Sequence, residues 1–264
     1  MEFRETPAQR EFVRTQQKKR RLVTAGRVTL LIGFLVLWEA GARLGWLDDF
    51  IFSSPSRAAL CFGKMAKDGS IARHTAVTVG ETLLSFFLVT GIGILGAVTL
   101  WYSHGLSRIL EPYLVMLNSL PKSALAPILI VWLGSRVRTI VVAAVSVAVF
   151  GAILTLHNGF SHADPDQLKL IRSLGGTRKD ILTKVLLPGA VPLLISNMKV
   201  NIGLCLVGVI IGEFLAADQG LGYLIIYGSQ VFKMDMVVMS IVILCLISAL
   251  LYQAIVFLER RVSR

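Results

Sequence analysis

The sequence has 264 residues, of which 55% are hydrophobic and only 16% are charged, and its mean hydropathy is +0.71. A soluble domain carries about 25% charged residues, so this composition excludes an ordinary soluble domain and indicates an all-α membrane protein. The formal net charge of +11 does not indicate a nucleic-acid partner, because the Lys and Arg residues cluster in short segments beside apolar stretches.

The N-terminal part of the chain divides into a basic arm, a span and a mixed segment. Residues 1–27 are polar and include the basic run from Lys18 to Arg21, which predicts a partly disordered cytoplasmic arm that could also lie against anionic membrane lipid. Residues 28–47 are the first candidate span. The segment 48–79 is too polar to cross a bilayer and is interpreted as interfacial.

Five more apolar stretches bring the expected number of transmembrane helices to six, all within one transmembrane domain, 28–264. The third span contains Pro112, Pro121 and Pro127, and prolines in a spanning helix free carbonyl groups that neighbouring helices or a water-filled path must satisfy. Segment 218–235 is apolar but broken by glycines, which predicts a re-entrant or interfacial helix. The five stretches are 80–102, 108–134, 139–158, 189–217 and 236–258.

The distribution of positive charge predicts which side faces the cytoplasm. Six spans place both termini, the link around Arg108 and the loop 164–188 on one side, and that side carries 17 Lys and Arg residues. The other side carries 8. The positive-inside rule therefore makes the first side, with the N- and C-termini, cytoplasmic.

The loop 164–188 carries start and stop signals for two short helices. Asp164 can cap a helix that begins with Pro165, and Gly175 offers a stop. Thr177 and Asp180 repeat the start signal, and Pro188 is predicted to close the second helix. The alternative interpretation is an ordinary solvated loop between two buried helices.

The spacing within this loop resembles a known motif. Gly175 is followed after nine residues by Val185-Leu186-Leu187-Pro188, which is similar to the "EAA" motif of binding-protein-dependent ABC importer permeases. In that family the loop is a coupling helix that inserts into a cleft of a cytoplasmic ATPase. Lys169-Leu170-Ile171 stands where the family has Glu-Ala-Ala. The resemblance implies ATPase-coupling roles for Asp164, Lys169, Ile171, Leu174, Gly175, Val185, Leu187 and Pro188.

Two further stretches resemble the nitrate, sulfonate and taurine branch of these permeases. One is the proline-rich stretch from Glu111 to Gly134, and the other joins Glu213-Phe214-Leu215 to Gly220-Leu221-Gly222-Tyr223. The resemblance implies a multi-pass permease in a bacterial inner membrane, without enzymatic activity of its own. It further implies a second permease chain, expected to be another copy of this one, an ABC ATPase dimer and an extracytoplasmic binding protein. The implied solute is a sulfonate, a nitrate-like ion or another small organic anion.

The sequence offers no catalytic, metal or cofactor site, since it lacks a phosphate-binding G-x-x-x-x-G-K-[ST] loop and its histidines and cysteines lack ligand spacing. Two ionisable residues within spans, Lys122 and Glu213, are candidates for a pathway or gating role because charges in a bilayer are costly. The alternatives are a snorkelling Lys122 and a Glu213 near headgroup water. Two alternative functions remain. One is a secondary transporter driven by an ion or proton gradient, in which Lys122 and Glu213 would change protonation state. The other is a membrane scaffold that transports no solute.

Overall fold

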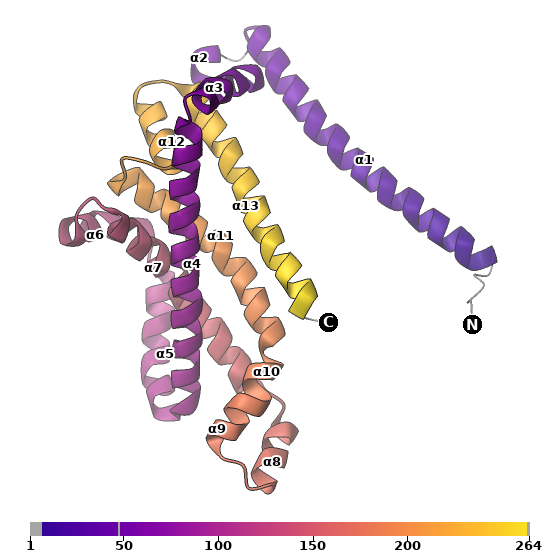
Figure 1. Ribbon diagram of the computed structural model, residues 1–264, viewed down its shortest axis with the longest axis vertical. Helices are drawn as coiled ribbons and strands as arrows, with labels where there is room; N and C mark the ends of the chain where they lie inside the picture. The colour runs from indigo at the N-terminus through magenta and orange to yellow at the C-terminus, as the bar shows by residue number, and fades with distance from the viewer. Residues whose placement is uncertain (1–6, 47, 263–264) are drawn as a thin grey trace.

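The computed structural model describes residues 7–46 and 48–262, and within these ranges every regular element is helical. Five helices are long and apolar enough to cross a membrane, and a sixth span results if one bent helix pair is counted together. These helices run between two ends of an elongated molecule (Figure 1). The expected all-α membrane fold is confirmed.

Helix α1, Pro7–Arg43, is longer than the predicted first span. Its membrane-compatible part is Arg21–Arg43, and residues 7–20 continue the same helix. The prediction of a partly disordered arm is therefore wrong for residues 7–27. The physical reason is that Lys, Arg, Gln and Glu are good helix formers, and a helix that extends an existing span needs no new nucleus. Helix α1 stands apart from the other spans and meets α2, Asp49–Phe52, and α3, Pro55–Lys67 (Figure 1).

The centre of the molecule is formed by α4, Ser70–Tyr102, α7, Val137–Ser161, and α11, Val191–Ala216. Small residues, Gly208 and Gly212, let α7 and α11 approach closely. A Cβ atom on Gly208 would lie 2.5 Å from the Cα of Ala144, and one on Gly212 would lie 2.9 Å from the Cα of Ile140. The packing is thus within one chain.

The third predicted span, 108–134, is not one helix. It consists of α5, His104–Ser119, a short 3₁₀ turn η1, Lys122–Leu125, and α6, Ala126–Leu133, with an 88° bend between its two halves. Leu120 is extended, with φ −63° and ψ 139°, because the ring of Pro121 disfavours helical backbone in the residue before it.

The remaining helices complete both ends of the molecule. The end that holds the C-terminus and the α4–α5 link also holds α8, Pro165–Ser173, and α9, Arg178–Ile181 (Figure 1). The π-helical η2, Leu182–Leu186, and α10, Leu187–Gly189, lead from there into α11. At the opposite end lie α3, α6 and α12, Leu221–Gln230, before α13, Met234–Val262, returns.

The close approach of α7 and α11 predicts an effect of enlarging Gly208. We expect Gly208→Leu to destabilise the folded chain by about 1–3 kcal/mol. The new side chain would clash with the backbone of α7, and displacing that backbone costs free energy. The measurement is the thermal unfolding midpoint of the purified protein in detergent. Gly203→Leu, on the same helix with nothing within 4 Å of its added Cβ, is the control and should leave the midpoint unchanged. Equal midpoints for the two variants would contradict the packing argument.

Candidate functional site: a coupling loop and a cavity at opposite ends

The loop 164–188 begins with a well-capped helix, α8. The Asp164 carboxylate accepts a hydrogen bond from the Asp166 amide at 2.9 Å. At the other end, Gly175 has φ +78°, and its N–H donates to the Arg172 carbonyl at 3.0 Å. The Gly176 N–H donates to the Ile171 carbonyl at 2.9 Å. These two bonds form a Schellman motif, which requires a left-handed residue where the sequence places Gly175.

Helix α9 begins with the second predicted cap. The Thr177 hydroxyl accepts from the Asp180 amide at 3.3 Å, and the Asp180 carboxylate accepts from the Thr177 N–H at 2.9 Å. Lys184 adds an ion pair to Asp180 at 2.9 Å. The Thr177 hydroxyl and then Lys184 hold the pKa of Asp180 well below its ordinary value. The loop is therefore a folded element rather than a flexible link.

Apolar side chains of this loop divide into an anchored set and an exposed set. Ile181 and Leu186 are buried in the body of the protein. Leu174 is 75% exposed at the bend between α8 and α9, and Leu170 is also exposed. Lys169, at the position of the family glutamate, pairs with Asp166 at 3.1 Å within its own helix.

The second helical run of the loop is longer than one short helix. It begins at Arg178, passes through η2 and α10 and ends at Gly189, one residue after Pro188, and a turn at Ala190 separates it from α11. Proline has no N–H and its ring crowds the preceding turn, and the wide π turn accommodates this loss. The Leu187 N–H donates to the Leu182 carbonyl, one residue further back than in an α-helix. Leu187 packs against the Phe160 cluster, and Val185 lines a small hollow beside α8.

A contact that the sequence did not reveal joins this loop to the bundle. The guanidinium of Arg178 donates to the Tyr102 carbonyl at 3.0 Å and lies 6.0 Å from the centre of the Tyr102 ring. Tyr102 is the last residue of α4. The loop is thus tied to a central span as well as to α11, and no local pattern relates two residues so far apart in the sequence.

Glu213 lies at the opposite end of the molecule and is 0% exposed. Its carboxylate accepts from the Thr78 hydroxyl at 2.7 Å and from the Gly222 N–H at 2.6 Å. The Thr78 hydroxyl in turn accepts from the Leu221 N–H at 2.8 Å. Glu213 therefore joins α4, α11 and the first turn of α12. The expectations that it meets headgroup water or pairs with a cation are wrong for the described residues, since burial and neutral donors account for its contacts.

The glycines that follow Glu213 make room for its carboxylate. Gly220 has φ +112°, and an added Cβ there would lie 2.3 Å from the carboxyl carbon of Glu213. At Gly222 an added Cβ would lie 2.8 Å from a carboxylate oxygen. The Glu213-to-Gly222 stretch noted in the sequence thus encodes one compact turn.

Lys122 lies apart from this arrangement. Its ammonium donates to the carbonyl of Asn118 in the same bent segment. Among the described residues, no ion pair joins Lys122 to Glu213. A different ion pair, Lys199 with Glu259 at 2.6 Å, links α11 and α13.

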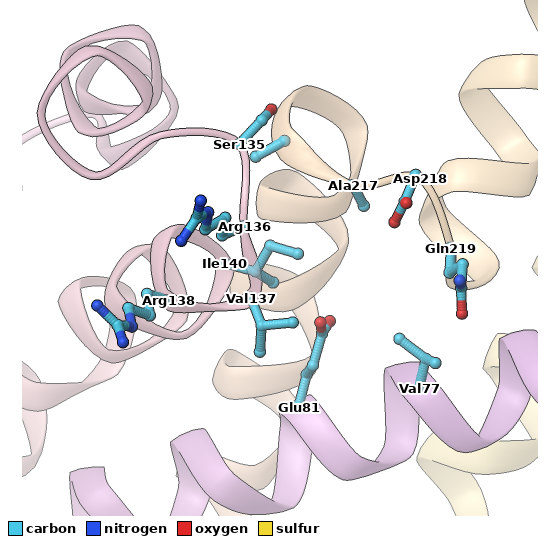
Figure 2. Close-up of a pocket in the computed structure, with 11 residues that line it drawn as sticks. Val77, Glu81, Ser135, Arg136, Val137, Arg138, Ile140, Ala217, Asp218 and Gln219 are labelled. Atoms are coloured by element: carbon cyan, nitrogen blue, oxygen red, sulfur yellow. The ribbon is translucent and has the colours of Figure 1, made fainter.

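A cavity of about 640 Å³ lies beside Glu213, between α4, the α6–α7 link and the α11–α12 link (Figure 2). Glu81, one helical turn after Thr78, is buried, and its carboxylate points into this cavity. The sequence did not indicate Glu81, Arg136 or Arg138 as site residues. The cavity wall is built from three segments far apart in the chain, so no local sequence pattern marks it. The lining is Val77, Glu81, Ser135, Arg136, Val137, Arg138, Ile140, Ala216, Ala217, Asp218 and Gln219.

Comparisons with known proteins relate this chain to a family of membrane transport components. Residues 89–264 match the family described as binding-protein-dependent transport system inner membrane component. A probable ABC transporter permease protein of Haemophilus influenzae is 29% identical, with 88% of this chain and 94% of that protein covered. The putative aliphatic sulfonates transport permease protein SsuC of Escherichia coli is 25% identical, with 88% of each covered. The taurine transport system permease protein TauC of Escherichia coli is 23% identical, with 96% of this chain and 95% of that protein covered.

A solved structure supports the fold. The bacterial alginate ABC transporter, in complex with its alginate pentasaccharide-bound periplasmic protein, matches this chain with a TM-score of 0.66. The match covers 94% of this chain and 98% of the other, at 13% identity.

The contacts of Glu213 predict the effect of neutralising it. In Glu213→Gln one acceptor becomes an amide NH₂, so either Thr78 or Gly222 loses its partner in a buried place, at a cost of about 1–3 kcal/mol. We expect a lower thermal unfolding midpoint and faster amide hydrogen exchange over residues 220–224. Glu111→Gln, which changes an exposed glutamate on α5, is the control. Unchanged exchange in the Glu213 variant would show that the carboxylate does not hold this turn.

The low pKa of Asp180 predicts how the loop responds to pH. A carboxylate with a lowered pKa contributes stability that is fully present above its unfolded pKa, roughly 3.9, and is lost as the pH falls towards the folded value. Hydrogen-exchange protection of residues 178–181, corrected for intrinsic rates, should be constant from about pH 7 to pH 5 and decline below about pH 4. Asp180→Asn should show weaker protection at neutral pH, whereas Asp166→Asn should not. A decline already near pH 6 in the unaltered chain would refute this assignment.

Proposed function

The chain belongs to the family of binding-protein-dependent transport system inner membrane components, and we propose that two copies of it enclose the pathway of an importer for a small organic anion. It is a multi-pass membrane protein and the permease subunit of an ABC importer of the nitrate, sulfonate and taurine branch. It is not an enzyme, because ATP hydrolysis belongs to a separate subunit. Its partners are an ABC ATPase and a solute-binding protein.

The observation that carries the proposal is the folded loop 164–188. Two capped helices present Leu174 at their bend, and buried anchors at Ile181 and Leu186 fix the loop to the body. An exposed leucine held on a rigid support is suited to a pocket on a partner, because its burial releases apolar surface from water. We assign ATPase coupling to Asp164, Lys169, Ile171, Leu174, Gly175, Val185, Leu187 and Pro188.

The charge distribution supports a cytoplasmic position for this loop. In the sequence, the segments expected on the same side as this loop contain 17 Lys and Arg residues, against 8 in the segments expected on the other side. From the positive-inside rule we infer that the loop and both termini face the cytoplasm of a bacterial cell, and that the cavity beside Glu213 faces the outer side of the inner membrane. A binding protein would deliver its solute to that outer end.

The kind of solute is inferred from the relatives and from the outer end of the chain. Two relatives bear the names of aliphatic sulfonate and taurine permeases. Arg136 and Arg138 are exposed at the rim of the outer cavity, where they provide positive charge for an arriving sulfonate or similar anion. Glu213 and Lys122 do not form the titrating pair that a gradient-driven transporter would need, so we do not propose that function.

The exposed Leu174 offers the test of ATPase coupling. Leu174→Ala should lower the affinity for the ATPase by about ten- to a hundredfold, because truncating one buried leucine removes roughly 1.5–3 kcal/mol of apolar burial. The measurement is co-purification of the ATPase with the tagged chain in mild detergent over a range of ATPase concentrations. Trp132→Ala is the control, because Trp132 is 76% exposed at the opposite end of the molecule. ATPase recovery that is equal for both variants, or absent from the unaltered chain, would exclude this coupling role.

A further inference from the structure

Two carboxyl groups meet in the interior of the bundle, at the end that holds α12. Glu81 of α4 and Glu213 of α11 are 5% and 0% exposed, and their side chains are hydrogen-bonded to each other. An ionised carboxylate has no proton to donate, so a hydrogen bond between two carboxyl groups requires a proton on one of them. Without that proton, two negative charges would lie in contact in a buried place, which is costly.

The hydrogen-bond donors around the pair assign the proton to Glu81. The Glu213 carboxylate already accepts from the Thr78 hydroxyl at 2.7 Å and from the Gly222 N–H at 2.6 Å, and such bonds stabilise a negative charge. By contrast, the buried Oε2 of Glu81 finds no hydrogen-bond donor among the described residues. A proton that Glu81 holds and donates to Glu213 supplies the hydrogen-bond partner that Glu81 lacks.

The charged groups on the cavity side do not neutralise the pair. The guanidinium groups of Arg136 and Arg138, at the start of α7, extend away from the Glu81 carboxyl group (Figure 2). Among the described residues, no ion pair joins either arginine to Glu81 or Glu213. Asp218, on the α11–α12 link, lines the same cavity and adds a further negative charge. A proton is therefore the positive charge that lies closest to the pair.

The titratable groups of the neighbouring helices are engaged elsewhere. His74 of α4 accepts a hydrogen bond from the Gly220 N–H at its Nδ1, at 3.0 Å, and an imidazole that accepts at this atom is uncharged. The ring of Tyr223, on α12, stacks on the His74 ring. Asp235 of α13 forms an ion pair with Arg57 of α3 at 3.1 Å. None of these contacts supplies a cation to the two carboxyl groups.

We propose that Glu81 and Glu213 form a proton-binding site that holds one proton at neutral pH and thereby joins α4 to α11 and to the first turn of α12. When hydroxide removes the proton, the O–H bond of Glu81 breaks, its electron pair stays on the oxygen, and the hydroxide becomes water. The two carboxylates then repel each other, which weakens the turn that Glu213 organises. Glu81 lines the cavity of about 640 Å³, so the proton can exchange with solvent there. The site holds this proton in place and assigns it no part in driving transport.

Infrared spectroscopy of the full chain in dodecyl maltoside tests for the proton directly. A protonated carboxyl group gives a C=O stretching band that a carboxylate lacks, and this detergent has no ester carbonyl to mask the band. At about pH 7 ordinary carboxyl groups are ionised, so we expect a band equivalent to one carboxyl group per chain. The absence of this band from the unaltered chain overturns the proposal.

Two variants and an isotope label locate the proton. The band should disappear in Glu81→Gln and remain in Glu111→Gln, which changes an exposed glutamate on α5. If Glu81→Gln does not fold, glutamate labelled with ¹³C at the side-chain carboxyl group is incorporated into the unaltered chain, and the band should move to lower wavenumber. A band that persists in folded Glu81→Gln, or that does not move with the label, overturns the proposal.

Hydrogen exchange tests what the proton does for the structure. As the pH is raised from about 7, the protection of residues 220–224, corrected for intrinsic rates, should fall roughly tenfold or more, at the same pH at which the infrared band disappears. Glu81→Gln should keep its protection, because its amide can donate to Glu213 in place of the proton. Tyr223→Phe removes the nearby phenol and should keep the decline.

Protection that stays constant while the band disappears, or that declines equally in folded Glu81→Gln, contradicts the structural role of the proton. Both measurements use the permease chain alone and need neither the ATPase nor the binding protein. Loss of ATPase recovery would therefore refute the proposed importer role without affecting this result, and the converse also holds.

Discussion

Close packing of α7 against α11 is the constraint on which the rest of this structure depends. In a bilayer the hydrophobic effect does not drive helices together, so association relies on van der Waals contact and on a few hydrogen bonds. Gly208 and Gly212 bring α11 against the backbone of α7, and Gly93 lets α4 approach Ala152 of α7 in the same way. These three helices position both the coupling loop and the outer cavity, because each of the two features is built on their ends.

The polar interactions are concentrated where these helices end. Glu213 closes the outer end by joining α4, α11 and α12, and Arg178 joins the loop to the last residue of α4 at the other end. Burying a polar group without a hydrogen-bond partner costs free energy in a membrane. Glu213 and Arg178 therefore favour the helix positions in which their hydrogen bonds are formed.

Features that depend on local chemistry were predictable from the sequence. The spans, the caps at Asp164 and Thr177, and the stop at Gly175 follow from hydropathy, capping residues and backbone sterics. The bend at Pro121 and the π turn before Pro188 were not predicted, because the same residue can break, kink or widen a helix according to what packs around it. Other features join segments far apart in the chain, so the sequence carries no local pattern that predicts them. These are the contacts of Glu213, the Arg178–Tyr102 link and the cavity at Glu81.

The π turn at 182–186 and α10 lead from the coupling loop to a turn at Ala190, and α11 runs from there to Glu213. Helix α11 has 26 residues and hence a length of about 39 Å. A tilt of about 5° at the loop would displace its far end by about 3 Å, enough to break hydrogen bonds of ordinary length. A helix of this length would therefore carry a small tilt at the loop to the hydrogen bonds of Glu213 at its other end.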